Sequence, residues 1–336
     1  MFPNLSFSQF KAYFRVLEPL HLPKYTGSTF RGALGHAMRK LHYGLKKVCT
    51  ECEICPQCRY TNLYAYFFES PADHPFIADN SRSIKIKQET YPQPFILEPP
   101  AGGLYLSGEF LPLSFTLVGM AIECFPFMAC ALSNISHVGI ARKEEGMKIR
   151  GKISLEAIVD AFPLDDGNET LIYDGRTGSM VGPGQILDFD IIKQSVMSNL
   201  NCERPVERIR ISFLTPLRFK NENRLGEALT FNVFIRNILR RLTLLSVHSP
   251  LSFCIDFKRL LFLAKSVKTE ESQLRWFDWE RYSARQKGKM KLGGFVGDIV
   301  FAGNLNEFLP YIKMCEFLNV GKNCIFGLGK YEIETS

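Results

Sequence analysis

Residues 305–334, LNEFLPYIKMCEFLNVGKNCIFGLGKYEIE, show the pattern of a helix, a glycine-rich turn and a strand in direct succession. The helix is predicted over residues 305–318 and the strand over residues 330–334. Gly321, Gly327 and Gly329 lie between them. Glycine tolerates positive φ and lets another backbone approach closely. The segment is therefore either a helix C-cap that leads into a tight turn or a loop that contacts a ligand.

The preceding residues of the second half supply the other elements of one folding unit. A strand, a helix and a pair of strands come before the helix and strand just described, and one further helix is inserted. The strand is predicted at 208–214, the helix at 227–247, the strand pair at 274–285 and 293–301, and the inserted helix at 256–267. The order strand, helix, two strands, helix, strand is that of a ferredoxin-like domain.

The first half of the chain follows the same order. Its strands are predicted at 7–17, 95–98, 107–118 and 152–159, and its helices at 28–48 and 121–135. We therefore expect an α+β protein of two tandem ferredoxin-like domains, residues 1–203 and 204–336, which meet near residues 201–205. The second domain carries the glycine-rich loop, and the first carries a cysteine-rich insertion.

Composition excludes several classes of protein. Of the 336 residues 46% are hydrophobic and 22% charged, which suits neither a disordered chain nor a fibrous one. The longest uncharged stretch, residues 124–141, is too polar to span a bilayer. The first residues, MFPNLSFSQFK, lack the pattern of a secretory signal. We expect a cytoplasmic protein with no membrane partner.

The positive charge is concentrated in the second half. Residues 1–203 hold 19 Lys and Arg against 21 Asp and Glu, a net charge of −2, whereas residues 204–336 hold 22 against 13, a net charge of +9. Residues 280–295, ERYSARQKGKMKLGGF, mix Arg281, Arg285 and Lys287 with aromatic residues. Such a mixture suits phosphate contacts and base stacking on RNA, and the alternative is a solvated basic surface.

Four cysteines follow the first predicted helix at a strict three-residue step: Cys49, Cys52, Cys55 and Cys58. Thiols stay reduced in the cytoplasm, and four cysteines around a polar turn are poorly explained by packing. Two CxxC pairs can form a tetrahedral zinc site, although the gap between them is short for one zinc ion. The spacing also fits three ligands of an iron–sulfur cluster, and a site without metal is the third alternative. Any metal here is expected to be structural.

Five segments in the same order resemble one family of proteins. They are FRGALGHAMRKLH (30–42), the cysteine cluster leading into YTNLYAYFFESP (60–71), FLTPLRF (213–219), WERYSARQ (279–286) and the glycine-rich loop. Together they resemble the CRISPR-associated endoribonucleases of the RAMP superfamily, which process precursor crRNA. The resemblance implies binding of CRISPR repeat RNA and one cut without a catalytic metal. The 2′-hydroxyl attacks the adjacent phosphate and leaves a 2′,3′-cyclic phosphate.

This chemistry needs a base, an acid and a cation, and in the family such groups commonly come from the first helix or the loop beside it. With Leu34 set at zero and ~100° per residue, His42 lies at roughly 80° and borders the apolar face, beside Lys46 at roughly 120°. His36 lies at roughly 200° and points away from the core. We therefore rank His42 ahead of His36, with Tyr25 and Lys46 as further catalytic candidates. The alternative is that both histidines are ordinary surface residues.

The first-helix flank that holds His42 also contains Gly32 and Gly35, which would let RNA approach the helix. RNA contacts are expected from basic side chains and from the glycine-rich loop. The candidates are Arg31, Arg39, Arg218, Arg281, Arg285, Lys287, Gly321, Lys322, Gly327 and Gly329.

Two other functions fit the sequence. A RAMP subunit that holds crRNA within a CRISPR effector complex, without cutting it, would share the fold and the glycine-rich loop. A metal-stapled regulator that binds duplex DNA is the more distant alternative, since no helix reads as a DNA-recognition helix.

Overall fold

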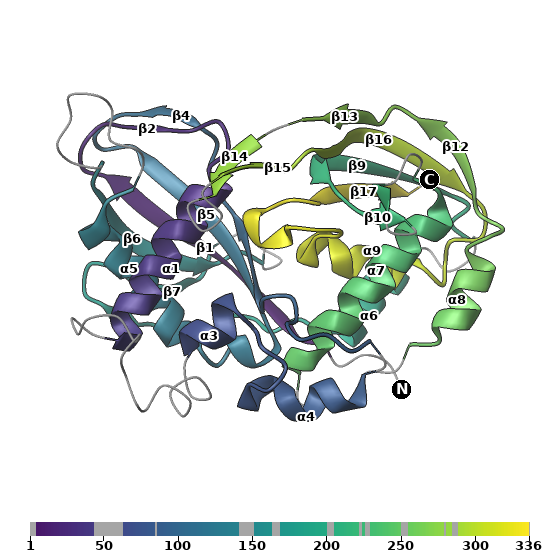
Figure 1. Cartoon of the computed structure of the whole chain (residues 1–336), viewed down its shortest axis with the longest axis horizontal. Coiled ribbons are helices and arrows are strands. Elements are labelled where there is room, and N and C mark those ends of the chain that lie inside the picture. The colour runs from purple at the N-terminus through teal and green to yellow at the C-terminus, as the bar shows by residue number, and fades with distance from the viewer. Residues whose placement is uncertain are drawn as a thin grey trace. The chain divides into compact units, whose positions relative to one another are not determined.

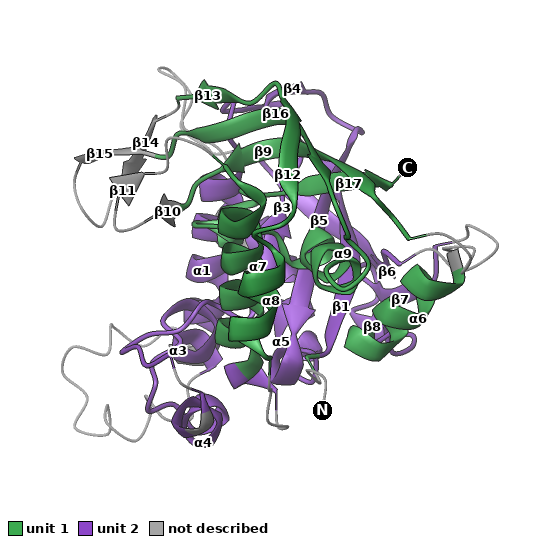
Figure 2. Cartoon of the chain, turned by 90° about the vertical axis from the view of Figure 1, so that its right-hand side faces the viewer, with its two compact units in different colours: residues 1–5, 187–246, 251–336 green, residues 6–186, 247–250 purple. Residues whose placement is uncertain are grey.

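A computed structural model of the chain describes residues 5–43, 63–84, 86–140, 151–162, 169–199, 205–221, 224–225, 229–249, 255–278, 280–283 and 288–335. The chain forms two compact units (Figure 2). Unit 1 comprises residues 1–5, 187–246 and 251–336, and unit 2 comprises residues 6–186 and 247–250. The sequence predicts a boundary between residues 203 and 204, whereas residues 187–246 and 251–336 form unit 1 together with residues 1–5.

Unit 2 is built on a six-stranded antiparallel sheet with the order β3-β5-β1-β6-β7-β8. The strands are β3 (Phe95–Glu98), β5 (Phe110–Val118), β1 (Phe7–Val16), β6 (Ile153–Asp160), β7 (Leu171–Asp174) and β8 (Ser179–Met180). Helices α1 (Gly27–Tyr43) and α5 (Phe125–Val138) pack against each other (Figure 1). Strands β1, β3, β5 and β6 with these two helices have the predicted ferredoxin-like order.

The core of unit 2 follows from the alternation in β1. From Phe10 to Val16 every second side chain is buried, as the period of a strand requires. Phe10 lies opposite Phe115 of β5, and its ring centroid is 4.5 Å from that of Phe125 at the start of α5. Sheet and helix therefore share one apolar layer.

Several short elements complete unit 2. They are β2 (Leu20–Leu22), which pairs with β4 (Gly103–Tyr105), helices α3 (Leu63–Phe68) and α4 (Pro75–Ser83), and the 3₁₀ turns η2 (Gly119–Ala121) and η3 (Ser246–His248), the last of which begins in unit 1. His248 donates from Nε2 to the carbonyl oxygen of Pro92 at 2.7 Å, which ties the η3 turn to unit 2.

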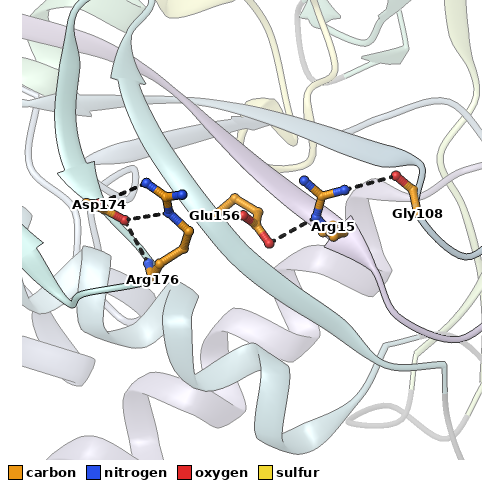
Figure 3. A network of polar contacts seen from close by, with 5 residues as sticks. All are labelled: Arg15, Gly108, Glu156, Asp174 and Arg176. Atoms are coloured by element: carbon orange, nitrogen blue, oxygen red, sulfur yellow. Dashed lines mark hydrogen bonds and ion pairs between the residues drawn. The ribbon is translucent and has the colours of Figure 1, made fainter.

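A row of charged side chains crosses β1, β6 and β7 (Figure 3). Arg15 donates from Nε to Glu156 at 3.1 Å and from Nη1 to the carbonyl oxygen of Gly108 at 3.5 Å. Arg176 donates from its side chain and its backbone N–H to Asp174, which holds the pKa of that carboxyl below its usual value. Exposed ion pairs of this kind contribute little to stability. Here each arginine drawn has an acidic neighbour.

Unit 1 repeats the arrangement with its own antiparallel sheet. The order is β12-β16-β9-β17, and β13 also pairs with β16. The strands are β12 (Lys268–Ser272), β16 (Gly294–Ala302), β9 (Arg208–Leu217), β17 (Tyr331–Thr335) and β13 (Arg275–Phe277). Helices α7 (Phe231–Leu245) and α9 (Leu309–Leu318) pack together. Phe234 of α7 contacts Phe301 of β16 and Tyr331 of β17 and so joins helix to sheet.

The remaining elements of unit 1 lie outside its main sheet. They are α6 (Phe189–Asn199), α8 (Phe257–Leu263), η4 (Cys324–Phe326) and the strand pairs β10 (Lys220–Asn221) with β11 (Arg224–Leu225) and β14 (Glu280–Ser283) with β15 (Gly288–Lys291). Among the described residues no helix is long and apolar enough to cross a membrane.

The predicted tandem ferredoxin-like fold is confirmed, with differences at some boundaries. The helix expected at 227–247 begins at Phe231, because Thr230 caps it by accepting from the N–H of Val233. The inserted helix expected at 256–267 ends at Leu263. Strand β12 was not predicted, because all five of its side chains are exposed and its sequence, KTEES, has no apolar alternation.

Candidate nucleic-acid interface

Helix α1 carries the two predicted catalytic histidines, His36 and His42, and one of its faces is buried in unit 2. Phe30, Leu34, Ala37 and Met38 are fully buried, and they recur at three- and four-residue steps. The opposite face is exposed to solvent and holds Gly32, His36, Arg39 and Lys40. The buried apolar stripe thus fixes which side chains of α1 can meet a ligand.

One flank of α1 is covered by α3. The guanidinium of Arg31 lies 5.1 Å from the ring centroid of Phe68, and that of Arg39 lies 6.0 Å from the ring of Tyr64. The two rings stack on each other with centroids 5.2 Å apart. A Cβ at Gly35 would lie 3.0 Å from the Phe68 ring. Gly35 therefore makes room for α3, and the expectation that it opens the helix to RNA is wrong.

Gly32, His36 and Lys40 form an exposed row along α1, one residue per turn. A Cβ at Gly32 would meet no atom within 4 Å, so the helix backbone is open to a ligand at this point. Lys40 thus places a cation one turn after the imidazole of His36, and Gly32 leaves the backbone open one turn before it. We call these three residues the α1 row.

Other predicted catalytic groups are only partly described. His42 lies in α1, but its side chain is outside the described part of the chain, as are Lys46 and all four cysteines of the cluster. The ranking of His42 ahead of His36 and the metal site therefore stay predictions. Tyr25 is half-buried just before α1, and burial raises the pKa of its phenol.

In unit 1 the glycine-rich loop packs on the end of β9. Gly321, Gly327 and Gly329 all have positive φ, between 73° and 93°. A Cβ at Gly321 would lie 2.5 Å from the carbonyl oxygen of Arg218, and one at Gly329 would overlap with the carbonyl oxygen of Val320. Gly327 and Gly329 are buried. These glycines close the loop against its own backbone and β9.

Side chains of β9 and α7 hold this loop in place. Thr215 donates to the carbonyl oxygen of Gly327 at 2.8 Å and accepts from the N–H of Lys330 at 2.9 Å. Arg241 of α7 is buried and donates from Nε and Nη2 to the carbonyl oxygen of Leu318, the last residue of α9. A cation at a helix C-terminus is favourable, because the carbonyl groups there carry partial negative charge.

Arg218 and Lys322 are brought together by the loop. The N–H of Lys322 donates to the carbonyl oxygen of Arg218 at 2.8 Å, and the Lys322 side chain is exposed. Arg218 is half-buried and donates from Nη1 to the carbonyl oxygen of Gly293 at 3.4 Å. Arg281 lies on β14 with its side chain outside the described part, and Arg285 and Lys287 lie outside it entirely.

The burial of Arg241 was not predicted, although its position in the sequence indicated it. Phe234, Ile238, Arg241 and Leu245 follow one another at steps of four, three and four residues, the period of one helix face. All four are buried. Because arginine is charged, it is not expected in a protein core, and the apolar pattern around it was therefore not extended to Arg241.

The chain matches two family models. Residues 5–185 match the family AF_1859_N, described as an N-terminal domain, and residues 211–331 match the family described as CRISPR-associated endoribonuclease Cas6. An uncharacterized protein of Archaeoglobus fulgidus is 24% identical over 330 residues, which cover 94% of this chain and 93% of that protein.

Several solved structures of the same fold have Cas6 in their names. A partial Cas6-RT-Cas1–Cas2 complex matches the whole chain with a TM-score of 0.57 and 14% identity, but this chain spans only 46% of that one. A Cas6 product complex matches with a TM-score of 0.50 and 15% identity, over 97% of this chain and all of that one. At these identities the likeness concerns the fold alone. The chain thus belongs to the AF_1859_N family, whose model covers residues 5–185, and its residues 211–331 are similar to the CRISPR-associated endoribonuclease Cas6 family.

Proposed function

We propose that this protein is an endoribonuclease that binds CRISPR repeat RNA and cuts it without a catalytic metal, by attack of a 2′-hydroxyl on the adjacent phosphate. The Cas6 family model over residues 211–331 supports the RNA substrate. The observation that carries the catalytic part is the α1 row, in which His36 stands exposed between an open backbone at Gly32 and a cation at Lys40.

His36 is the proposed general base or acid. An imidazole can both accept and donate a proton near neutral pH, which this reaction requires at the 2′-hydroxyl or at the leaving 5′-oxygen. Lys40 begins about 6 Å further along the helix axis, one turn on, so its long side chain can reach the phosphate that His36 meets. There it stabilises the additional negative charge of the pentacoordinate phosphorane.

The surroundings of α1 favour His36 over His42 as the first residue to test. The helix flank expected to admit RNA beside His42 contains Gly32 and Gly35, and Phe68 occupies the space beside Gly35. His42 follows Gly35 by seven residues and so belongs to the same side of the helix. Tyr25 and Lys46 remain secondary candidates for the acid and for the cation.

RNA binding is assigned to unit 1 as well as to α1. Exposed Lys322 and half-buried Arg218 lie side by side at the glycine-rich loop, and the β14–β15 hairpin carries Arg281 and the basic residues that follow it. Gly327 and Gly329 act by shaping this loop, because both are buried. The backbone near Gly321 and Lys322 is then the part of the loop that meets phosphate.

Two further assignments accompany this proposal. The four cysteines at 49–58 hold a structural zinc ion, or alternatively an iron–sulfur cluster, in the segment that joins α1 to α3. CRISPR proteins are the proposed protein partners, because one similar structure is a Cas6-RT-Cas1–Cas2 complex. Neither assignment enters the cleavage chemistry.

The test is incubation of the purified protein with end-labelled repeat RNA in excess EDTA. We expect one cut, with a 2′,3′-cyclic phosphate on the upstream product. An RNA with a single 2′-deoxy nucleotide at the scissile position should bind equally well and stay intact. Cutting that requires a divalent metal, or cutting of the deoxy RNA, would overturn the mechanism. Binding of the repeat without cutting would instead identify a crRNA-holding subunit.

A further inference from the structure

Trp276 presents a partly exposed aromatic surface in unit 1. It lies in the middle of β13, opposite Phe295 of β16, and 41% of its surface is exposed. A tryptophan ring offers a large flat surface for contact with a ligand.

The indole is held in one orientation. Its Nε1–H donates to Oδ1 of Asp278 at 2.7 Å, and its ring meets Phe295 edge to face with centroids 5.1 Å apart. The Phe295 ring also packs against the ring of Phe219, with centroids 6.0 Å apart. A Cβ at Gly293 would lie 2.5 Å from Oδ1 of Asp278 and 3.0 Å from Nε1 of Trp276, so a side chain there would disturb both groups. A ring fixed in this way loses little entropy when a ligand stacks on it.

The neighbours of the indole connect it to the basic elements of unit 1. The carbonyl oxygen of Gly293 accepts from Arg218, whose own carbonyl oxygen accepts from Lys322 of the glycine-rich loop. The basic hairpin β14–β15 begins four residues after Trp276. Cations next to an exposed, rigid aromatic ring are the combination that binds single-stranded nucleic acid.

We infer that Trp276 is a stacking platform for one unpaired nucleobase of the bound RNA, and that Asp278 positions its ring. This inference rests on the proposed function and adds a statement about the substrate. A base within a duplex has both faces covered by its neighbours, so the nucleotide at Trp276 must be single-stranded or turned out of the stack. Because every base offers a π face, the contact tolerates different bases at that position.

The first experiment compares repeat RNA affinities of three variants with that of the full-length wild-type protein. Trp276→Leu should weaken binding roughly 5- to 150-fold, the range found for loss of one stacked base, whereas Trp276→Phe should keep most of the affinity. The slope of log K against log salt should stay unchanged, since no phosphate contact is lost. Phe262→Leu is the matched control: Phe262 is 72% exposed on α8 of the same unit and should bind like wild type.

The second experiment locates the base. An abasic nucleotide is moved through the repeat, and at one position it should weaken wild-type binding while having no further effect on Trp276→Leu. Wild-type affinity in Trp276→Leu, with the thermal unfolding temperature also unchanged, would refute the platform and leave the proposed function standing. If the abasic nucleotide and Trp276→Leu weaken RNA binding independently of each other at every position of the repeat, the platform is refuted as well. Failure of the wild-type protein to bind repeat RNA would overturn the proposed function and the platform together.

Discussion

The buried guanidinium of Arg241 shows how one residue supports a loop that it does not belong to. It donates twice to the carbonyl oxygen of Leu318, where α9 ends and the chain turns toward the glycine-rich loop. Burial also raises the pKa values of the neighbouring thiols Cys315 and Cys324, and the positive charge of Arg241 partly offsets this. A neutral side chain at position 241 would leave the carbonyl group of Leu318 without this donor.

Replacement of Arg241 by methionine should therefore lower the free energy of unfolding by roughly 1.5–3 kcal/mol, the usual contribution of a hydrogen bond to a charged group. Arg240→Met, one residue away on the exposed side of α7, should change it by less than about 0.5 kcal/mol. Urea unfolding followed by circular dichroism measures both. Equal stabilities of the two variants would show that the contact with Leu318 carries no net energy.

Gly32 and Gly35 are chemically identical residues in one helix with different surroundings. Gly32→Ala should stabilise the protein by about 0.5–1 kcal/mol, because alanine favours the helix and no atom lies near its Cβ. Gly35→Ala should gain less or become destabilising, because its Cβ would press on the Phe68 ring. Urea unfolding of the two variants tests this, and an equal gain at both positions would mean that α3 does not pack against Gly35.

At the scale of elements, the glycine-rich loop is constrained in two ways, by positive φ and by the lack of space for a Cβ, and two variants separate these effects. Gly329 has φ of +73° and no space for a Cβ, whereas Gly178 has φ of +72° and only the Tyr173 hydroxyl within 4 Å, at 3.8 Å. An alanine at either position adopts an unfavourable backbone conformation, which costs about 1–2 kcal/mol. Only the alanine at position 329 must also displace backbone.

Gly178→Ala should thus cost about 1–2 kcal/mol of unfolding free energy, and Gly329→Ala clearly more than that. Because the loop positions Lys322 beside Arg218, Gly329→Ala should also weaken RNA binding, and Gly178→Ala should not. Thermal unfolding and an RNA-binding titration on the same preparations measure both effects. Similar losses of stability would show that the loop relaxes around the added methyl group.

At the scale of the whole molecule, the uneven distribution of charge predicts where salt sensitivity originates. Joint replacement of Arg281, Arg285 and Lys287 by glutamine should lower the slope of log K against log salt by ~0.7 for each lost phosphate contact with single-stranded RNA. Glutamine replacements at Arg15 and Arg176 should leave the slope unchanged, because their charges are paired with Glu156 and Asp174 (Figure 3). If instead the replacements at Arg15 and Arg176 lower the slope and the triple replacement leaves it unchanged, the RNA lies on the sheet surface of unit 2.

The sequence was sufficient for the repeated order of strands and helices, because periodicity of apolar residues reports burial directly. It could not reveal β12, whose side chains are all exposed, or the flank of α1 that α3 covers. Contact between Gly35 and Phe68 joins residues 33 positions apart, and no local pattern encodes it. Trp276 and Arg241 were missed because their roles depend on neighbours in space, Asp278 and Phe295 for the first and Leu318 for the second.

The claim that cleavage depends on the α1 row is tested most directly by single-turnover cleavage of repeat RNA in EDTA with His36→Ala and His42→Ala. We expect His36→Ala to lose about 10²–10⁴-fold in rate, the usual contribution of a general acid or base, while its RNA affinity stays at the wild-type value. His42→Ala should lose much less. Wild-type cleavage by His36→Ala would contradict the assignment, and a large loss confined to His42→Ala would move the site to the flank of α1 that faces α3.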